Sequence, residues 1–418
     1  MATSTDTMIA RPGEALADHP SVLTRPRRLE SLDVFRGLTI AGMILVNNPG
    51  AAAYWPLDHA DELMTAHPAG WYPGKGWVEA NGWTPTDLIF PFFLFIVGTS
   101  MVLSFAARRA RGDSRLSLMK HAVRRSALIL LIGYAIRILP YVDFSHMRYP
   151  GVLQRIALVY LFASVITLWT STRGRILWIA GLLAGYYAVM RFLPVPGCDH
   201  AAWMTQHCSL AGFIDRKLML GHLYRRDFDP EGLLSTLPAI ATTLLGTLAG
   251  EFLRRTSPQQ PKSGPVVSPT ASLRHRLRGL ALAGVAGVAA GYAWHPFFPI
   301  SKPLWTSSYV LFTAGAACLL LAICWWLIEM RGWRLWSRPF LWLGSNAILA
   351  YALSTFGAKL GSIIKVANGI TVQTWVYEHW FAPLAQEKNA SLAFAISYVV
   401  VWTLFAWALY RKKIFVKV

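Results

Sequence analysis

Polar side chains that can do chemistry lie within the first apolar segment of this chain. Residues 31–50 read SLDVFRGLTIAGMILVNNPG, which is apolar enough to cross a bilayer yet contains Asp33, Arg36 and Asn47. His59 follows shortly after the segment ends. Ionisable and amide side chains are costly inside a membrane unless they face protein or water, so by default they mark a functional site.

A further carboxylate, Asp87, is expected about one turn inside the outer face of the membrane, in the stretch NGWTPTDLIFPFFLFIVG that opens the next apolar run. Histidine changes protonation near neutral pH, and a carboxylate beside it fixes which ring nitrogen carries the proton. One interpretation of Asp87 is therefore an orienting partner for His59. The other is a structural ion pair with Arg137 or Arg155 that locks three helices together. The sequence leaves both open.

The polar residues of the first segment fall on one side of a helix. Asp33, Ile40 and Met43 lie on the same stripe as Arg36 and Asn47, because successive members are three or four residues apart. From Arg36 to Asn47 the helix would rise about 16 Å. The stripe therefore runs from the cytoplasmic end of the helix toward its outer end. One interpretation is that the stripe belongs to a functional site. The other is that Asp33 and Arg36 form an ion pair whose side chains extend to the inner headgroups.

The elements that must position these residues are membrane helices. The chain has 418 residues, of which 54% are hydrophobic and 15% charged, too apolar a composition for a soluble domain of this size. We predict an all-α, polytopic membrane protein with about ten transmembrane helices, because apolar runs of about 20 residues can cross the hydrocarbon core. The ten runs are 32–48, 87–107, 125–140, 152–169, 176–194, 233–253, 277–294, 306–328, 339–356 and 392–410.

The distribution of basic residues predicts the orientation. If the N-terminus is cytoplasmic, 26 of the 40 Lys and Arg residues fall on inside segments and 10 on outside loops. Such a bias predicts that both termini are cytoplasmic. The net charge of +19 then reflects topology, so we expect a lipid bilayer and no nucleic acid as partner.

The chain divides into a disordered cytoplasmic tail, residues 1–29, and one transmembrane domain, residues 30–418. We expect outer loops at about 51–83 and 195–231 and a flexible cytoplasmic linker at about 256–272.

Small residues give further predictions. Cys198 and Cys208 share an outer loop, and their spacing leaves a disulfide open. Cys318 and Cys324 lie in one apolar run and are expected to be small buried residues. Three Gly-xxx-Gly pairs suit close helix packing. They are Gly181/Gly185, Gly246/Gly250 and Gly287/Gly291.

Several long stretches, in order along nearly the whole membrane part, resemble the transmembrane acetyltransferases related to lysosomal heparan-alpha-glucosaminide N-acetyltransferase. They are RLESLDVFRGLTIAGMILVNNPG, YWPLDHA, NGWTPTDLIFPFFLFIVG, YPGVLQRIAL, DPEGLLSTLPAIATTLLGTLAGEFLRR, LWTSSYVLFTAG and LGSNAILAYALS.

The resemblance implies acetyl transfer across a membrane, from cytosolic acetyl-CoA to an acceptor on the other side. The family's active-site asparagine corresponds to Asn47 in LVNN, and its histidine to His59, which follows Tyr54 and Trp55. The chain departs from the family by lacking its lumenal N-terminal domain and by carrying an insert at about 61–80.

This resemblance implies roles for the polar residues. His59 would take the acetyl group as nucleophile or deprotonate the acceptor as general base. Asn47 would donate to the thioester carbonyl, and Asp87 or Arg155 would orient the set. The expected acetyl-CoA contacts are Arg36 and Asp33, Arg124 and Arg125 on the cytoplasmic side, and Arg155.

We expect the acceptor to be an extracytoplasmic amino sugar or glycan and the membrane to be a bacterial inner membrane. No metal site is predicted, because no pair of outer histidines has a metal-binding spacing, and His222 is kept as a supporting residue. A secondary transporter with Asp87, Arg137 and Arg155 at a solute site is the alternative function, although no inverted repeat is evident. A homodimer, the choice between acetyl-histidine relay and direct transfer, and the role of the insert stay open.

Overall fold

The fold was analysed in a computed structural model, which describes residues 29–50, 58–59, 82–255, 269–366 and 369–416. Within these ranges the chain is helical, with one isolated β-bridge between Lys365 and Thr371 and no strand. The all-α prediction is therefore confirmed for the described residues. The predicted tail, most of the loop at 51–83, the insert and most of the linker at 256–272 lie outside these ranges.

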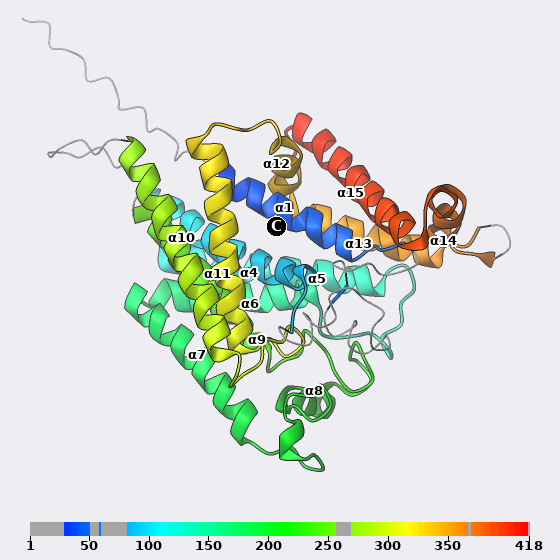
Figure 1. The fold of residues 1–418 in the computed structure, drawn as a ribbon, viewed down its shortest axis with the longest axis horizontal. Helices are drawn as coiled ribbons and strands as arrows, with labels where there is room; N and C mark the ends of the chain where they lie inside the picture. The colour runs from blue at the N-terminus through cyan, green and yellow to red at the C-terminus, as the bar shows by residue number, and fades with distance from the viewer. Residues whose placement is uncertain (1–28, 51–57, 60–81, 256–268, 367–368, 417–418) are drawn as a thin grey trace, which may run out of the picture.

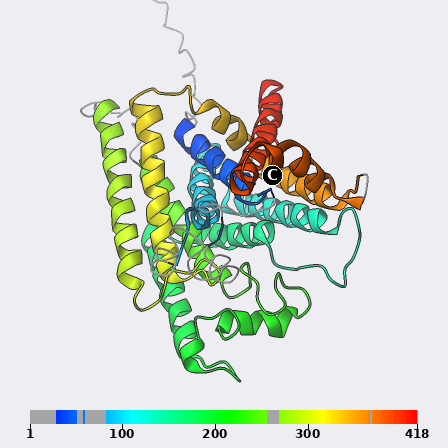
Figure 2. The same cartoon turned by 45° about the vertical axis from the view of Figure 1, so that its right-hand side comes forward.

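The long helices form a bundle in which α10 and α11 lie side by side at one edge and α13 and α15 lie toward the other (Figures 1 and 2). The α-helices are α1 (Glu30–Val46), α4 (Ile89–Arg109), α5 (Arg115–Ile138), α6 (Val152–Trp169), α7 (Thr172–Phe192), α8 (Leu210–Met219), α9 (Thr236–Arg255), α10 (Pro269–Trp294), α11 (Ser307–Trp325), α12 (Arg338–Ser345), α13 (Ala347–Ile363), α14 (Val372–Val376) and α15 (Glu387–Arg411). Short 3-10 turns occur at Pro85–Leu88 (η1), His200–Ala202 and Ala382–Leu384, and π-helical turns at Trp326–Met330 and Tyr377–Phe381.

Among the described residues, six helices are long and apolar enough to cross a membrane, or seven if one bent pair counts as a span. The six are Pro85–Arg109, α6, α9, Leu273–Trp294, Ser307–Met330 and α15. Three other predicted runs coincide with α1, α5 and α7. Of these, α1 has only 17 residues, whereas α5 and α7 carry several basic side chains.

The predicted run at 339–356 is not one straight helix. It is divided into α12 and α13, which meet at an angle of 86°. Asn346 separates them with non-helical backbone angles, and its buried side chain binds the C-terminal segment, donating to the Ile414 carbonyl at 2.9 Å and accepting from the Val416 amide at 2.8 Å. Hydropathy alone predicted a continuous span because the residues on both sides of this break are apolar.

Glycines allow α4 and α9 to approach closely. A Cβ at Gly246 would collide with the Phe95 carbonyl, and one at Gly98 would collide with the Thr243 carbonyl. The small gap also allows hydrogen bonds between the helices, such as the 3.0 Å bond from the Thr99 hydroxyl to the Gly246 carbonyl. These contacts confirm close packing at the predicted Gly246/Gly250 pair.

The other two glycine pairs differ. A Cβ at Gly287 or Gly291 would meet the backbone of α11, so this prediction is confirmed for α10 and α11. Gly181 and Gly185 instead lie on the exposed side of α7, and a Cβ there would meet nothing within 4 Å. The prediction was wrong for this pair because spacing shows which residues share a face but not what that face contacts.

The four cysteines have different roles. Cys198 and Cys208 form a disulfide, with 5.6 Å between their Cα atoms, in the segment that leads to α8. This pairing settles the alternative that the sequence left open. Cys318 and Cys324 are free and buried in α11, as predicted.

Asp215 connects α8 to the beginning of α9. Its side chain is completely buried, and its Oδ1 accepts a 2.9 Å hydrogen bond from the Leu233 amide. Burial disfavours the charged form of a carboxyl group and raises the pKa of Asp215 to about 7.

The folded protein should lose stability as the pH rises through the range set by Asp215. The unfolded chain releases this proton near the ordinary pKa of 3.8, whereas the folded chain retains it until about 7. The destabilisation therefore develops between these two values and is complete above the higher one. We expect Asp215→Asn to reduce the fall in thermal unfolding midpoint between about pH 5 and about pH 8. Glu378→Gln, at an exposed position, serves as the control, and equal pH dependence of both variants would contradict the assignment.

Gly246→Leu should lower the free energy of unfolding by about 1–3 kcal/mol, because the added side chain must push α4 away from α9. Gly181→Leu is the matched control on an open helix face. Thermal unfolding in the same detergent compares the two, and a Gly181→Leu protein that is equally destabilised would show that the effect is not due to helix packing.

Candidate active site

A histidine–carboxylate pair lies where α4 begins. Asp87 is in η1, and its side chain is fully buried. Its Oδ1 lies 2.7 Å from His59 Nδ1, and its Oδ2 accepts a 3.0 Å hydrogen bond from the Thr84 amide. The sequence TPTD favours this geometry, because Thr84 and Asp87 form a capping box and Pro85 suits the first turn of a helix.

Thr84 also connects the two segments that carry the pair. Its hydroxyl donates to the Asp58 carbonyl at 2.7 Å, next to His59 in sequence. The same residue therefore positions the carboxylate through its amide and the histidine segment through its hydroxyl. The predicted pairing of His59 with Asp87 is present in the structure.

A lysine from a distant part of the chain completes this group. Lys302 Nζ lies 2.7 Å from His59 Nδ1, 3.0 Å from His59 Nε2 and 3.4 Å from Asp87 Oδ1. The three side chains thus form one cluster, in which an ammonium group faces both the imidazole and the buried carboxylate.

The turn that carries Lys302 is rigidly held. Trp305 has a φ of 50°, which is rare for a bulky residue, and its amide donates to the Lys302 carbonyl at 3.0 Å. The indole is buried, donates to the Thr242 hydroxyl at 3.2 Å and packs edge-on against Phe90 and Tyr309. The Tyr309 hydroxyl also donates to the Asp87 carbonyl. Helices α4, α9 and α11 therefore fix the position of the lysine together.

Our sequence reasoning did not select Lys302. It lies two residues before LWTSSYVLFTAG, one of the stretches that carry the family resemblance, and this proximity was the available signal. One of the two interpretations paired Asp87 with Arg137 or Arg155. Instead Arg155, which is buried, donates to the Gly232 carbonyl at 3.1 Å and to the Ser235 hydroxyl, and lies over the Trp305 ring.

Asn47 lies at the C-terminal end of α1 and lines a different space. Its side chain is exposed and faces a cavity of about 530 Å³ between α1, α5, α6 and α13. Among the described residues, no hydrogen bond joins Asn47 to His59. The neighbouring Asn48 is buried and donates to the Ile44 carbonyl at 2.7 Å.

The Asp33–Arg36 pair lies at the other end of α1, with 2.9 Å between Arg36 Nη1 and Asp33 Oδ1. Arg36 also donates to Ser100 of α4 at 2.6 Å and to the Gly344 carbonyl of α12 at 3.3 Å. These bonds connect three helices.

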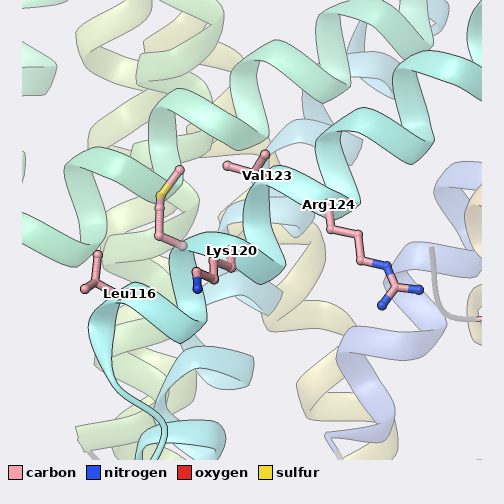
Figure 3. A pocket seen from close by; sticks show the side chains of 5 residues that line it. Leu116, Lys120, Val123 and Arg124 are labelled. Carbon is pink, nitrogen blue, oxygen red and sulfur yellow. The ribbon is translucent and has the colours of Figure 1, made fainter.

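Arg124 and Arg125 occupy different surroundings on α5. Arg125 lies over the Tyr160 ring of α6, 4.8 Å from its centroid. Arg124 is exposed and lines a cavity of about 320 Å³ with Leu116, Lys120 and Val123 (Figure 3). The two arginines therefore point to different environments, and only Arg124 lies on this open surface.

His222 supports a loop near the larger cavity. Its ring stacks on Tyr149 with 3.9 Å between centroids, and its Nδ1 lies 2.8 Å from the Met147 carbonyl. Within the described ranges, no group of three or more His, Cys, Asp or Glu side chains is arranged to hold a metal ion.

Comparison with known proteins identifies the family. Residues 28–277 match the family model described as heparan-alpha-glucosaminide N-acetyltransferase, catalytic. The chain is 30% identical to heparan-alpha-glucosaminide N-acetyltransferase of Mus musculus and 29% identical to that of Homo sapiens, and each alignment covers 94% of this chain. The chain spans about 60% of the length of these curated relatives. Because the family model covers more than half of the sequence, the chain belongs to the heparan-alpha-glucosaminide N-acetyltransferase catalytic family.

Proposed function

We propose that this protein is a transmembrane acetyltransferase that moves an acetyl group from cytosolic acetyl-CoA to an amine or hydroxyl of an extracytoplasmic sugar or glycan. The observation that carries the proposal is the His59–Asp87–Lys302 cluster in a chain of this family. The names of the two relatives favour a glucosamine amino group as acceptor.

His59 acts through Nε2. When Nδ1 donates its proton to Asp87 Oδ1, the lone pair on Nε2 is directed away from the carboxylate. In direct transfer, Nε2 removes the proton from the acceptor amine as the amine attacks the thioester carbonyl; the C–S bond then breaks, and the proton passes from Nε2 to the departing thiolate of CoA. In a relay, Nε2 itself attacks that carbonyl, the C–S bond breaks, and the acceptor then takes the acetyl group from the ring.

Lys302 supplies the positive charge of the site. Its ammonium group compensates the buried charge of Asp87 and, once substrate displaces it from Nε2, donates to the oxygen on which negative charge develops. Asn47 is proposed as a second donor to that oxygen, which requires the thioester carbonyl to lie between His59 and the cavity that Asn47 lines.

The proposed topology has ten spans with both ends in the cytoplasm. Glu30, at the start of α1, lies 3.5 Å from Arg334, just before α12, and Asn346, just after α12, binds the segment that follows α15. These contacts favour a common side for the two ends. The Cys198–Cys208 disulfide favours an oxidising compartment for the opposite side, consistent with a bacterial inner membrane.

Acetyl-CoA would approach from the side of Arg36. The proposed contacts are Arg36 with Asp33, and Arg124 and Arg125 of α5, because guanidinium groups bind phosphates well. Exposure of Arg124 supports this role for that residue. Arg155 is proposed as a positioning residue, since it contacts Trp305 of the turn that carries Lys302.

His59→Ala should reduce turnover of radiolabelled acetyl-CoA with glucosamine by about 10²–10⁴-fold, because the group that transfers the proton or acetyl is lost. Asp87→Asn should also lower turnover strongly, because the amide no longer favours the required tautomer. The matched control is His207→Ala, which breaks a His–Asp pair on the exposed surface. Retained turnover in correctly folded His59→Ala protein would overturn the proposal, and solute uptake into liposomes without acetyl transfer would favour a transporter.

Lys302→Met should lower kcat by at least about 10²-fold if the ammonium group stabilises charge in the transition state. Lys302→Arg should restore part of that loss. Because removal of the cation also leaves Asp87 less well compensated, thermal midpoints are measured beside kcat, with exposed Lys365→Met as control. An unchanged kcat in Lys302→Met would restrict the lysine to a structural role.

A further inference from the structure

The cavity beside Asn47 has a composition that indicates what it binds. Its volume is about 530 Å³, within the range of small-molecule sites. It lies at the outer end of α5 and the beginning of α6, and α13 forms another wall. The lining includes three basic side chains, Arg137, Arg148 and Lys359.

The three cations are engaged differently. Arg148 forms ion pairs with buried Asp229, 2.7 Å from its Nε, and with Glu231. Lys359 Nζ donates to the Ile136 carbonyl at 3.0 Å and so caps the end of α5. Lys359 therefore contacts backbone carbonyls, whereas Arg148 contacts two carboxylates.

The contacts of Arg137 differ from those of Arg148. In the part of the chain that the structure describes, no carboxylate lies within ion-pairing distance of its guanidinium group. That group lies against Gly151, where a Cβ would collide with Nη2, and so the backbone turn before α6 leaves room for it. Asp143, the acidic residue in the lining, is already hydrogen-bonded to Ser145 and lies 3.0 Å from His146.

The rim of the cavity is apolar. The segment that follows α5 exposes Leu139, Tyr141, Val142 and Phe144, with 70% of Tyr141 and 62% of Phe144 accessible. Tyr141 also lines the cavity. In the proposed topology this segment lies at the extracytoplasmic surface of the membrane, where aromatic side chains contact both headgroups and acyl chains. An arginine that contacts no carboxylate directly among the described residues, beside such a rim, is complementary to an anionic amphiphile.

We propose that the acceptor is an amino sugar carried on an anionic lipid of the outer leaflet. Arg137, supported by the charge of Lys359, binds the anionic group of the headgroup, and Tyr141 and Phe144 contact the lipid chain. Asn47, in the same lining, then faces the sugar. This inference rests on the proposed function and specifies its acceptor.

Four synthetic acceptors separate the contributions of charge and chain: glucosamine, glucosamine 1-phosphate, decyl glucosaminide and decyl glucosamine 1-phosphate. We expect kcat/KM to be highest for the acceptor with both groups. Arg137→Met should reduce the preference for phosphate-bearing over phosphate-free acceptors by about 10-fold, as expected for loss of one charged hydrogen bond. Arg226→Met, at an exposed outer position, should retain the preference, and Arg137→Lys should restore part of it.

The rim is tested with the double variant Tyr141→Ser, Phe144→Ser, which should reduce the preference for decyl over chain-free acceptors. Leu220→Ser, at another exposed apolar position of the outer loops, is its control. A preference for phosphate without a preference for the chain would point to a soluble anionic acceptor and overturn the lipid assignment.

A binding measurement that needs no turnover tests the acceptor site independently of the proposed transferase function. Equilibrium dialysis of radiolabelled decyl glucosamine 1-phosphate against His59→Ala protein, with and without Arg137→Met, needs no turnover. If binding is tight and requires Arg137 but the wild type does not acetylate the ligand, the proposed transferase function is contradicted and the proposed lipid-binding site is supported. Equal affinity of both proteins, or equal kcat/KM for all four acceptors, would overturn the site.

Discussion

The burial of the Asp87 carboxylate at the beginning of a membrane helix is the constraint on which the rest of the site depends. A buried charge is tolerated only when hydrogen bonds and opposite charge compensate it. Here the compensation comes from the Thr84 amide, the His59 ring and the Lys302 ammonium group, which lie on three separate segments. The same contacts that make the carboxylate tolerable therefore bring an imidazole and a cation together.

This arrangement requires helices that approach closely and cannot shift. Gly98 and Gly246 bring α4 and α9 into backbone contact, and Trp305 fills the space between α4, α9 and α11. The rare backbone conformation of Trp305 is maintained because its ring is buried and hydrogen-bonded. Packing around Trp305 thus positions Lys302 within hydrogen-bond distance of His59.

The protein contains two polar environments in which the charged groups contact one another differently. Around Asp87 the charges are matched and buried, as suits a group that must hold a fixed tautomer. The cavity beside Asn47 contains Arg137, which contacts no carboxylate directly among the described residues, and exposed aromatic residues lie at its rim. The first environment is suited to chemistry and the second to recognition, and we propose that the acceptor connects them.

The sequence by itself determined the all-α class of the described residues and the approximate position of nine of the ten predicted apolar runs, because hydropathy acts over short stretches. It offered His59 only as one of the possible partners of Asp87. Only the tertiary structure decided that Lys302 and not Arg137 or Arg155 faces Asp87, since 243 residues separate Lys302 from His59. It also decided that Asn346 divides a predicted span and that Gly181 and Gly185 face no helix. The physical reason is that a sequence pattern specifies which residues share a helix face, whereas the partner of that face depends on how distant helices cross.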